Sequence, residues 1–278
     1  MSPVVFTVVL LAAVLHASWN ALIKAGGDPY LRLAIVNLTQ SVVALPLLFV
    51  VGLPAAEAWP WLIGSVVTHL VYYFFLAAGY RIGDLSHVYP IARGIAPPLV
   101  ALGALLIAGE VLSLTGTAAI LLVCLGIWIV AGRGPTSRRP LLLALGTGFS
   151  IAAYTVCDGI GARASDNVLA YIAWLFFLDG WPFALWVALR RRGALIVAIP
   201  RAWKPAVGGG LMSLVAYGMV IWAMSVAPLA YVSALRETSV LLAAAIGTLL
   251  MGEPFGRRRL FAAVIVCIGV AILQFSRA

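Results

Sequence analysis

Residues 105–110, LLIAGE, and residues 248–253, TLLMGE, each close a long apolar stretch with the same Gly-Glu pair. A stretch of about 20 mostly apolar residues is what an α-helix needs to cross the hydrocarbon core of a bilayer. The same alternation of apolar stretches and short polar breaks continues in both directions from these two segments. The pattern therefore predicts an all-α integral membrane protein.

The composition supports this prediction. Of the 278 residues, 64% are hydrophobic and 10% are charged, and the mean hydropathy is +1.10. Soluble domains carry about 25% charged residues, so much of this surface must face membrane lipid. The net charge of +9 arises from basic residues in short loops. This arrangement is typical of topology signals rather than of a nucleic-acid interface, and no nucleic-acid partner is expected.

Breaks at charged residues, Gly and Pro divide the chain into ten candidate transmembrane helices. The longest predicted loop, residues 190–204, has 15 residues, which leaves no room for a soluble domain. Continuous apolar runs and the need to satisfy every backbone group in lipid exclude open sheets. The first run has no basic leader and is predicted to be a retained helix. The predicted spans are 4–24, 31–52, 59–80, 85–108, 114–131, 140–162, 168–189, 205–227, 229–251 and 259–275.

The two halves of the chain resemble each other. A shift of 143 positions aligns the Gly-Glu pairs, Arg93 with Arg236, Cys124 with Cys267 and Gly126 with Gly269. Nearer the start of each half the shift is 138, which aligns Asn20 with Asp158 and Asp28 with Asp166. The alternative explanation is shared apolar composition. An odd number of five spans per repeat predicts two inverted repeats, residues 1–132 and 140–278, joined by a linker at 133–139.

The two Gly-Glu segments, each followed by a polar gap and then a Gly-containing helix, resemble the EamA type of the drug/metabolite transporter superfamily. The resemblance implies ten helices, a multi-pass location in the bacterial inner membrane, and export of amino acids, drugs or other small metabolites. The chain is similar to bacterial aromatic amino acid exporters. Residues 16–20, HASWN, also resemble members found with phosphonate-utilisation genes. The four-helix multidrug relatives carry a glutamate in their first helix, whereas residues 4–23 here contain no acid.

Polar side chains inside predicted spans are the candidate substrate-binding residues, because ionisable groups in a bilayer are costly and need compensation. In the first span His16, Trp19 and Asn20 share one face, and in the third His69, Tyr73 and Tyr80 do so with Tyr72 beside them. Packing between helices is the alternative role for the first group. The remaining candidates are His87, Tyr89, Arg93, Tyr154, Asp158, Tyr217, Arg236 and Glu237.

Arg93 has two possible roles. It is suited to binding a substrate carboxylate through its fork of donors, or to pairing with an acid on another helix. Arg236 and Glu237 are adjacent, so on a regular helix they point about 100° apart and are not expected to pair with each other. Asp158 or Asp179 is a candidate partner for Arg236. Glu110 and Glu253 lie at loop ends and are expected to act as caps or as structural features of the family, not as binding groups.

The sequence carries no catalytic motif, and neither an enzyme activity nor a cofactor is expected. The three cysteines, Cys124, Cys157 and Cys267, lie in apolar stretches without a CxxC motif, so buried packing is expected and a metal site is not. Gly208–Gly209–Gly210 lacks the Lys-Ser/Thr that a phosphate-binding loop needs.

The leading hypothesis is a secondary transporter, in the export direction, of amino acids or similar small zwitterions by alternating access. Phosphonates or cationic drugs are alternative substrates, and the oligomeric state is open, with a monomer possible. A membrane enzyme or structural scaffold is the alternative of another class. A water-filled central cavity lined by the first, third, fourth, sixth, eighth and ninth spans would favour transport, and a solid bundle with polar groups opening to lipid would favour the enzyme or scaffold.

Overall fold

The computed structural model describes residues 1–24, 28–82, 85–132, 137–191, 193–251 and 256–276. These residues form helices α1 Pro3–Lys24, α2 Pro29–Val51, α3 Trp59–Ile82, α4 Leu85–Ala108, α5 Leu114–Ala131, α6 Arg138–Ala164, α7 Val168–Arg190, α8 Ala194–Val226, α9 Leu229–Arg236, α10 Ser239–Met251 and α11 Arg257–Phe275. A short 3-10 helix, Ala56–Ala58, precedes α3. Counting α9 and α10 as one interrupted span, the ten predicted spans are confirmed within the described residues.

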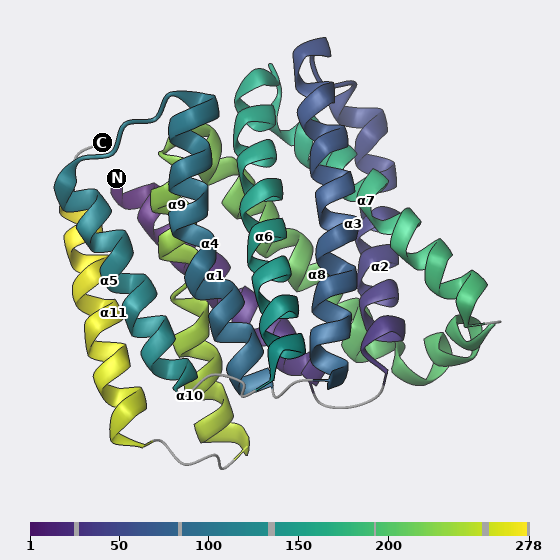
Figure 1. Cartoon of the computed structure of the whole chain (residues 1–278). Coiled ribbons are helices and arrows are strands. Elements are labelled where there is room, and N and C mark those ends of the chain that lie inside the picture. Colours follow the sequence, from purple (N-terminus) through teal and green to yellow (C-terminus); the bar gives the residue numbers. More distant parts are fainter. Residues whose placement is uncertain (25–27, 83–84, 133–136, 192, 252–255, 277–278) are drawn as a thin grey trace.

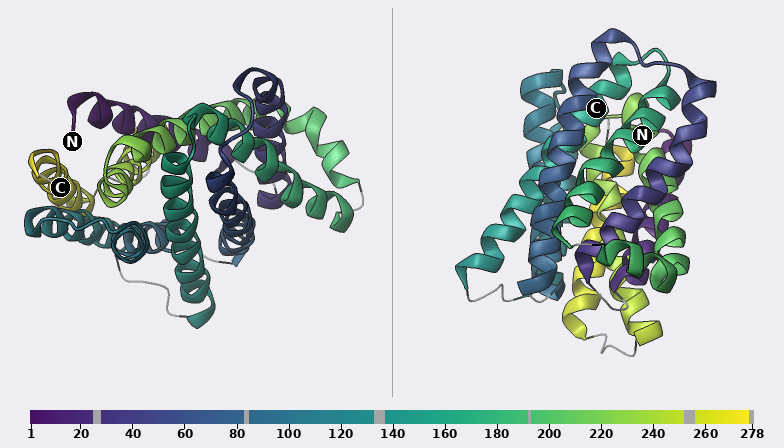
Figure 2. Two further views of the ribbon diagram at one scale, coloured as in Figure 1. Left: turned by 90° about the horizontal axis from the view of Figure 1, so that it is seen from above. Right: turned by 90° about the vertical axis from the view of Figure 1, so that its right-hand side faces the viewer.

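The helices pack with the symmetry expected of two repeats. Helices α1 and α6 begin the two halves, and α3 and α8 are the third helix of each. Helix α6 packs against α3, and α1 packs against α8. Two further pairs join helices at matching places in the two halves, α2 with α7 and α5 with α11. These two pairs lie on opposite sides of the bundle, at the left and the right of Figure 1 (Figures 1 and 2). The first Gly-Glu pair ends α4 at one face, while α10, which leads toward the second, ends at the other.

The ninth span differs from the continuous helix predicted over 229–251. The helix is interrupted at Glu237 and Thr238, between α9 and α10. The Thr238 hydroxyl donates to the Leu235 carbonyl oxygen at 2.8 Å, and the Thr238 amide donates to the same carbonyl. Local bonds of this kind compete with the helical ladder. Discontinuous helices are typical of the centre of secondary transporters.

The predicted loop 190–204 is wrong. Helix α8 begins at Ala194 and runs for 33 residues, although its most apolar part starts only at Trp203. A helix of this length extends well past an apolar core of about 30 Å. Of the basic residues in this segment, Arg201 and Lys204 lie on α8, whereas Arg190 ends α7 and Arg191 follows it.

One end of the bundle is tied together by Glu110 and Arg163. Glu110, just after α4, accepts a hydrogen bond at 3.0 Å from the backbone amide of Leu229, the first residue of α9. It also forms an ion pair of 2.6 Å with Arg163 near the end of α6. Arg163 donates to the carbonyl oxygens of Met224 and Ala227 at the end of α8. The predicted capping role of Glu110 is confirmed, whereas Glu253 lies outside the described residues.

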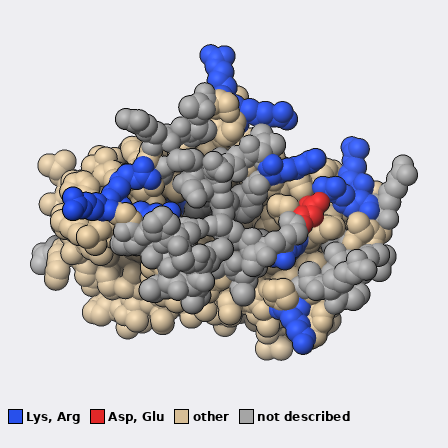
Figure 3. Space-filling view, turned by 90° about the horizontal axis from the view of Figure 1, so that it is seen from below, with Lys and Arg blue, Asp and Glu red and all other residues tan. Residues whose placement is uncertain are grey.

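The opposite end of the molecule is basic. Lys and Arg side chains are spread over this face when the molecule is seen from below (Figure 3). They include Arg138 and Arg139 at the start of α6, and Arg191, which pairs with Asp28 at 3.1 Å. Of the cysteines, Cys124 is buried but Cys267 is exposed on the outer face of α11, so burial was predicted correctly for the former only.

Candidate functional site

Polar residues from both halves of the chain gather in the interior rather than on the lipid-facing surface. His69 on α3 is 6% exposed, and Asp158 on α6 and Glu237 after α9 are 0% exposed. Arg93 on α4 and Arg236 at the end of α9 are each 2% exposed. Five ionisable side chains inside an apolar bundle need mutual compensation, and such groups mark binding sites in membrane proteins.

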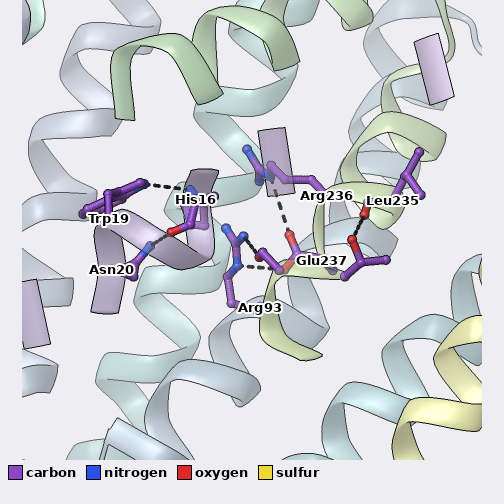
Figure 4. A network of polar contacts seen from close by, with 9 residues as sticks. His16, Trp19, Asn20, Arg93, Leu235, Arg236 and Glu237 are labelled. Atoms are coloured by element: carbon purple, nitrogen blue, oxygen red, sulfur yellow. Dashed lines mark hydrogen bonds and ion pairs between the residues drawn. The ribbon is translucent and has the colours of Figure 1, made fainter. Parts of the chain in front are cut away.

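The first group of contacts is a charged triad. Arg93 Nε lies 2.7 Å from Glu237 Oε2, and Arg93 Nη2 donates to the Ser239 hydroxyl at 3.1 Å. Arg236 Nε approaches the other oxygen of Glu237 to 3.7 Å. Figure 4 shows both guanidinium groups directed at the same carboxylate. Of the two roles predicted for Arg93, pairing with an acid on another helix is the one observed in the structure.

The expectation that Arg236 and Glu237 do not interact is wrong. The argument assumed a regular helix through both residues, but α9 ends at Arg236 and the chain turns at Glu237 and Thr238. The break brings the two side chains to the same side. Among the described residues, no ion pair joins Arg236 to Asp158 or Asp179.

The second group of contacts is an aromatic cluster around His69. The His69 ring stacks on Tyr154 with 3.9 Å between centroids. Tyr72, Tyr73 and Tyr217 surround it at 6.5, 6.1 and 5.6 Å. The His69 Nδ1 atom lies 3.1 Å from the Ser65 hydroxyl one turn earlier. Binding pockets commonly combine aromatic walls with a few polar groups in this way.

The third group contains two buried acids held by tyrosines. Asp158 accepts hydrogen bonds from Tyr217 at 2.5 Å and Tyr171 at 3.1 Å. Asp179 on α7 accepts a hydrogen bond from Tyr73. The Arg236 guanidinium lies over the ring of Tyr217, 5.8 Å from its centroid. Tyr217 therefore contacts a cation on its face and a carboxylate at its hydroxyl.

Helix α1 contributes the remaining predicted group. The Trp19 Nε1 atom donates to His16 Nδ1 at 3.2 Å, and the two rings meet edge to face. Asn20 donates to the His16 carbonyl oxygen at 2.8 Å. His16 lies within electrostatic range of Arg93 and Arg236, which connects this face of α1 with the triad (Figure 4).

The structure thus brings together twelve of the fifteen predicted site residues; the side chains of the other three, Tyr80, His87 and Tyr89, lie outside the described part. Tyr171, Ser65 and Ser239 were not among the predicted site residues. Tyr171 is fully buried, but a tyrosine near the start of a span is usually an interface anchor. Ser65 stands one helical turn before His69, a spacing that was available as a signal for it.

Comparison with known proteins agrees with this architecture. Residues 138–275 match the family model described as "EamA-like transporter family". No curated protein matches the chain. A solved structure described as "Crystal structure of protein" superposes with a TM-score of 0.78 over 98% of this chain and 96% of that chain. The two sequences are 16% identical, so the likeness extends to the fold alone.

Proposed function

Because the chain belongs, through residues 138–275, to the EamA-like transporter family, we propose that it is a secondary transporter of amino acids or similar small zwitterions. The single observation that carries this proposal is the arrangement about Tyr217. A buried cation, Arg236, lies on the face of its ring, and a buried acid, Asp158, accepts its hydroxyl. A cation at the face of the ring and an acid at its hydroxyl suit a ligand that carries both a negative and a positive group.

The aromatic cluster supports the same class of ligand. His69, Tyr72, Tyr154 and Tyr217 form walls that accept an apolar or aromatic side chain. Asp158 and the faces of the tyrosines are suited to an ammonium group, through charge and through cation–π attraction. The triad at Arg236 is suited to a carboxylate.

The transport step we propose is alternating access. Residues of α3 and α4 in the first half, and of α6, α8 and α9 in the second, contribute to one interior site. A relative movement of the two halves would therefore alter access to this site from either face. The Glu110–Arg163 contact joins α4 to α6, α8 and α9 at the end where the chain begins. It is the contact we expect to break when that end opens.

Uptake into proteoliposomes tests the proposed function. Purified protein is reconstituted and supplied with labelled amino acids, phosphonates and cationic dyes, with protein-free liposomes as the control. We expect saturable uptake of at least one amino acid and exchange with the unlabelled compound inside. Uptake of dyes or phosphonates without any amino acid would replace the zwitterion proposal. Absence of uptake and binding for the entire panel would contradict the transporter proposal.

A further inference from the structure

We propose that Arg236, and not Arg93, binds the substrate carboxylate. The inference rests on the proposed function and assigns the anion-binding atoms of that site. It follows from three observations on the triad of Arg93, Glu237 and Arg236. These are its net charge, the matching positions of the two arginines in the repeat, and the contacts that each arginine makes with Glu237.

The charge of the triad is unbalanced. Two arginines share one glutamate, so the cluster carries a net charge of +1 while all three side chains are at most 2% exposed. Uncompensated charge in a low-dielectric interior is strongly unfavourable. One additional carboxylate within the cluster brings its net charge to zero.

The repeat matches Glu237 with a glycine. Arg93 and Arg236 occupy matching positions at the shift of 143, and the position that matches Glu237 is Gly94. A Cβ atom at Gly94 would lie 2.3 Å from Trp128 Nε1. The indole of Trp128 therefore occupies the space in which a side chain at position 94 would begin. Within the triad, one carboxylate therefore serves two arginines at matching positions of the repeat.

The single glutamate is engaged mainly by Arg93. Arg93 is 2.7 Å from Glu237 Oε2 and also donates to Ser239, whereas Arg236 Nε is 3.7 Å from Oε1. Nη2 of Arg236 has no hydrogen-bond partner among the described residues, and its Nε has only the 3.7 Å contact with Glu237. These two atoms form one edge of the guanidinium fork. That edge matches the two oxygens of a carboxylate in the bidentate geometry that arginine prefers.

The position of Arg236 is fixed on its other side. Its guanidinium lies over Tyr217, and Tyr217 is held by its hydrogen bond to Asp158. A carboxylate bound at Nη2 of Arg236 thus leaves the attached amine within the region of the aromatic cluster and Asp158. The geometry therefore points to an α-amino acid bound by its carboxylate at Arg236.

The experiment compares ligands that differ only in the carboxylate. Binding of L-phenylalanine, L-leucine and L-threonine to the purified full chain is measured against their amides, which keep the amine and side chain. We expect wild-type protein to prefer at least one acid over its amide by about tenfold or more, the ratio that corresponds to 1.4 kcal/mol. Arg236→Gln is expected to reduce this ratio to about 1, and Arg236→Lys to an intermediate value, because lysine keeps the charge but lacks the fork.

Arg191→Gln is the matched control. It removes a guanidinium from the partly exposed ion pair with Asp28, and we expect it to keep the wild-type ratio. If Arg236→Gln is not monodisperse, Arg236→Lys alone tests the inference. A preference for the acid over its amide that falls to a third or less of the wild-type ratio supports the inference, and an unchanged ratio overturns it. A full preference in Arg236→Gln, or its loss only in Arg93→Gln, also overturns the inference while the transporter proposal stands. If neither acids nor amides bind wild-type protein or enter proteoliposomes, the proposed function fails and the inference falls with it.

Discussion

At the scale of single residues, the interior is organised by charges that compensate one another across helices. Glu237 serves two arginines, and Asp158 accepts hydrogen bonds from two tyrosines. Because breaking a buried pair leaves an uncompensated group, each of these contacts influences both folding and binding. Substitutions that differ in the charge they leave behind separate these effects.

The triad predicts an order of stabilities. Arg93→Gln or Arg236→Gln leaves one arginine with Glu237 and a net charge of zero, whereas Glu237→Gln leaves two buried arginines with a net charge of +2. We therefore expect Glu237→Gln to destabilise the protein most, by roughly 3–5 kcal/mol. Thermal unfolding in detergent measures this order. An equal or smaller loss in Glu237→Gln than in the arginine variants would contradict the charge argument.

Asp158 predicts recognition of the ligand amine. Asp158→Asn keeps the shape of the side chain but removes its charge, so the preference for a free amine over an N-acetylated amino acid is expected to fall about tenfold or more, a change of about 1.4 kcal/mol. Binding to purified protein measures this ratio. Tyr171→Phe is the comparison, since it removes only the longer of the two hydrogen bonds to Asp158, and its ratio should stay closer to the wild-type value. A wild-type ratio in Asp158→Asn would contradict this role.

At the scale of helices, close packing depends on glycines at particular crossings. A Cβ atom at Gly180 on α7 would lie 2.0 Å from the Ser41 hydroxyl and 2.3 Å from the Asn37 carbonyl oxygen on α2. Because one of these atoms belongs to the backbone, a rotamer change cannot relieve the overlap. Small residues that allow such approach are characteristic of membrane helix interfaces.

Gly180→Ala is therefore expected to separate α2 from α7 and to destabilise the protein by about 1–3 kcal/mol. Gly208→Ala on α8 is the matched control, because a Cβ atom there has nothing within 4 Å. The difference between their midpoints of thermal unfolding measures the effect. Equal midpoints would show that the α2–α7 crossing tolerates a methyl group.

At the scale of the whole molecule, the distribution of basic residues predicts orientation. Of the 18 Lys and Arg residues, fourteen fall on one predicted side and only Arg163 and Arg277 on the other, with Arg93 and Arg236 internal. The fourteen are Lys24, Arg32, Arg81, Arg133, Arg138, Arg139, Arg190, Arg191, Arg192, Arg201, Lys204, Arg257, Arg258 and Arg259. The positive-inside rule places the richer side in the cytoplasm.

Both termini lie on the poorer side, since Met1 and Gln274 are in contact at the end where Arg163 is found. We therefore expect both termini outside the cytoplasm. Alkaline phosphatase fused after residue 278 should be active in intact cells. Fluorescence from a cytoplasmic reporter at the same position would place the termini inside.

The membrane class, the number of spans and most of the interior polar residues could be predicted from the sequence. Apolar length is a local property that the bilayer imposes on each helix separately, and residues such as Asp158 are conspicuous because charge is rare in that setting. The internal repeat and the Gly-Glu pairs likewise required no coordinates.

Which of these residues contact one another could be learned only from the packing of the helices. Arg93 and Glu237 are 144 positions apart, and their pairing depends on the packing of α4 against α9. The contact between Arg236 and Glu237 depends on the break in the helix, at which Thr238 bonds to Leu235. No proline or glycine stands at this break to signal it in the sequence. The hydropathy of a helix depends on that helix alone, whereas the partner of a buried charge depends on helices that approach from distant parts of the chain.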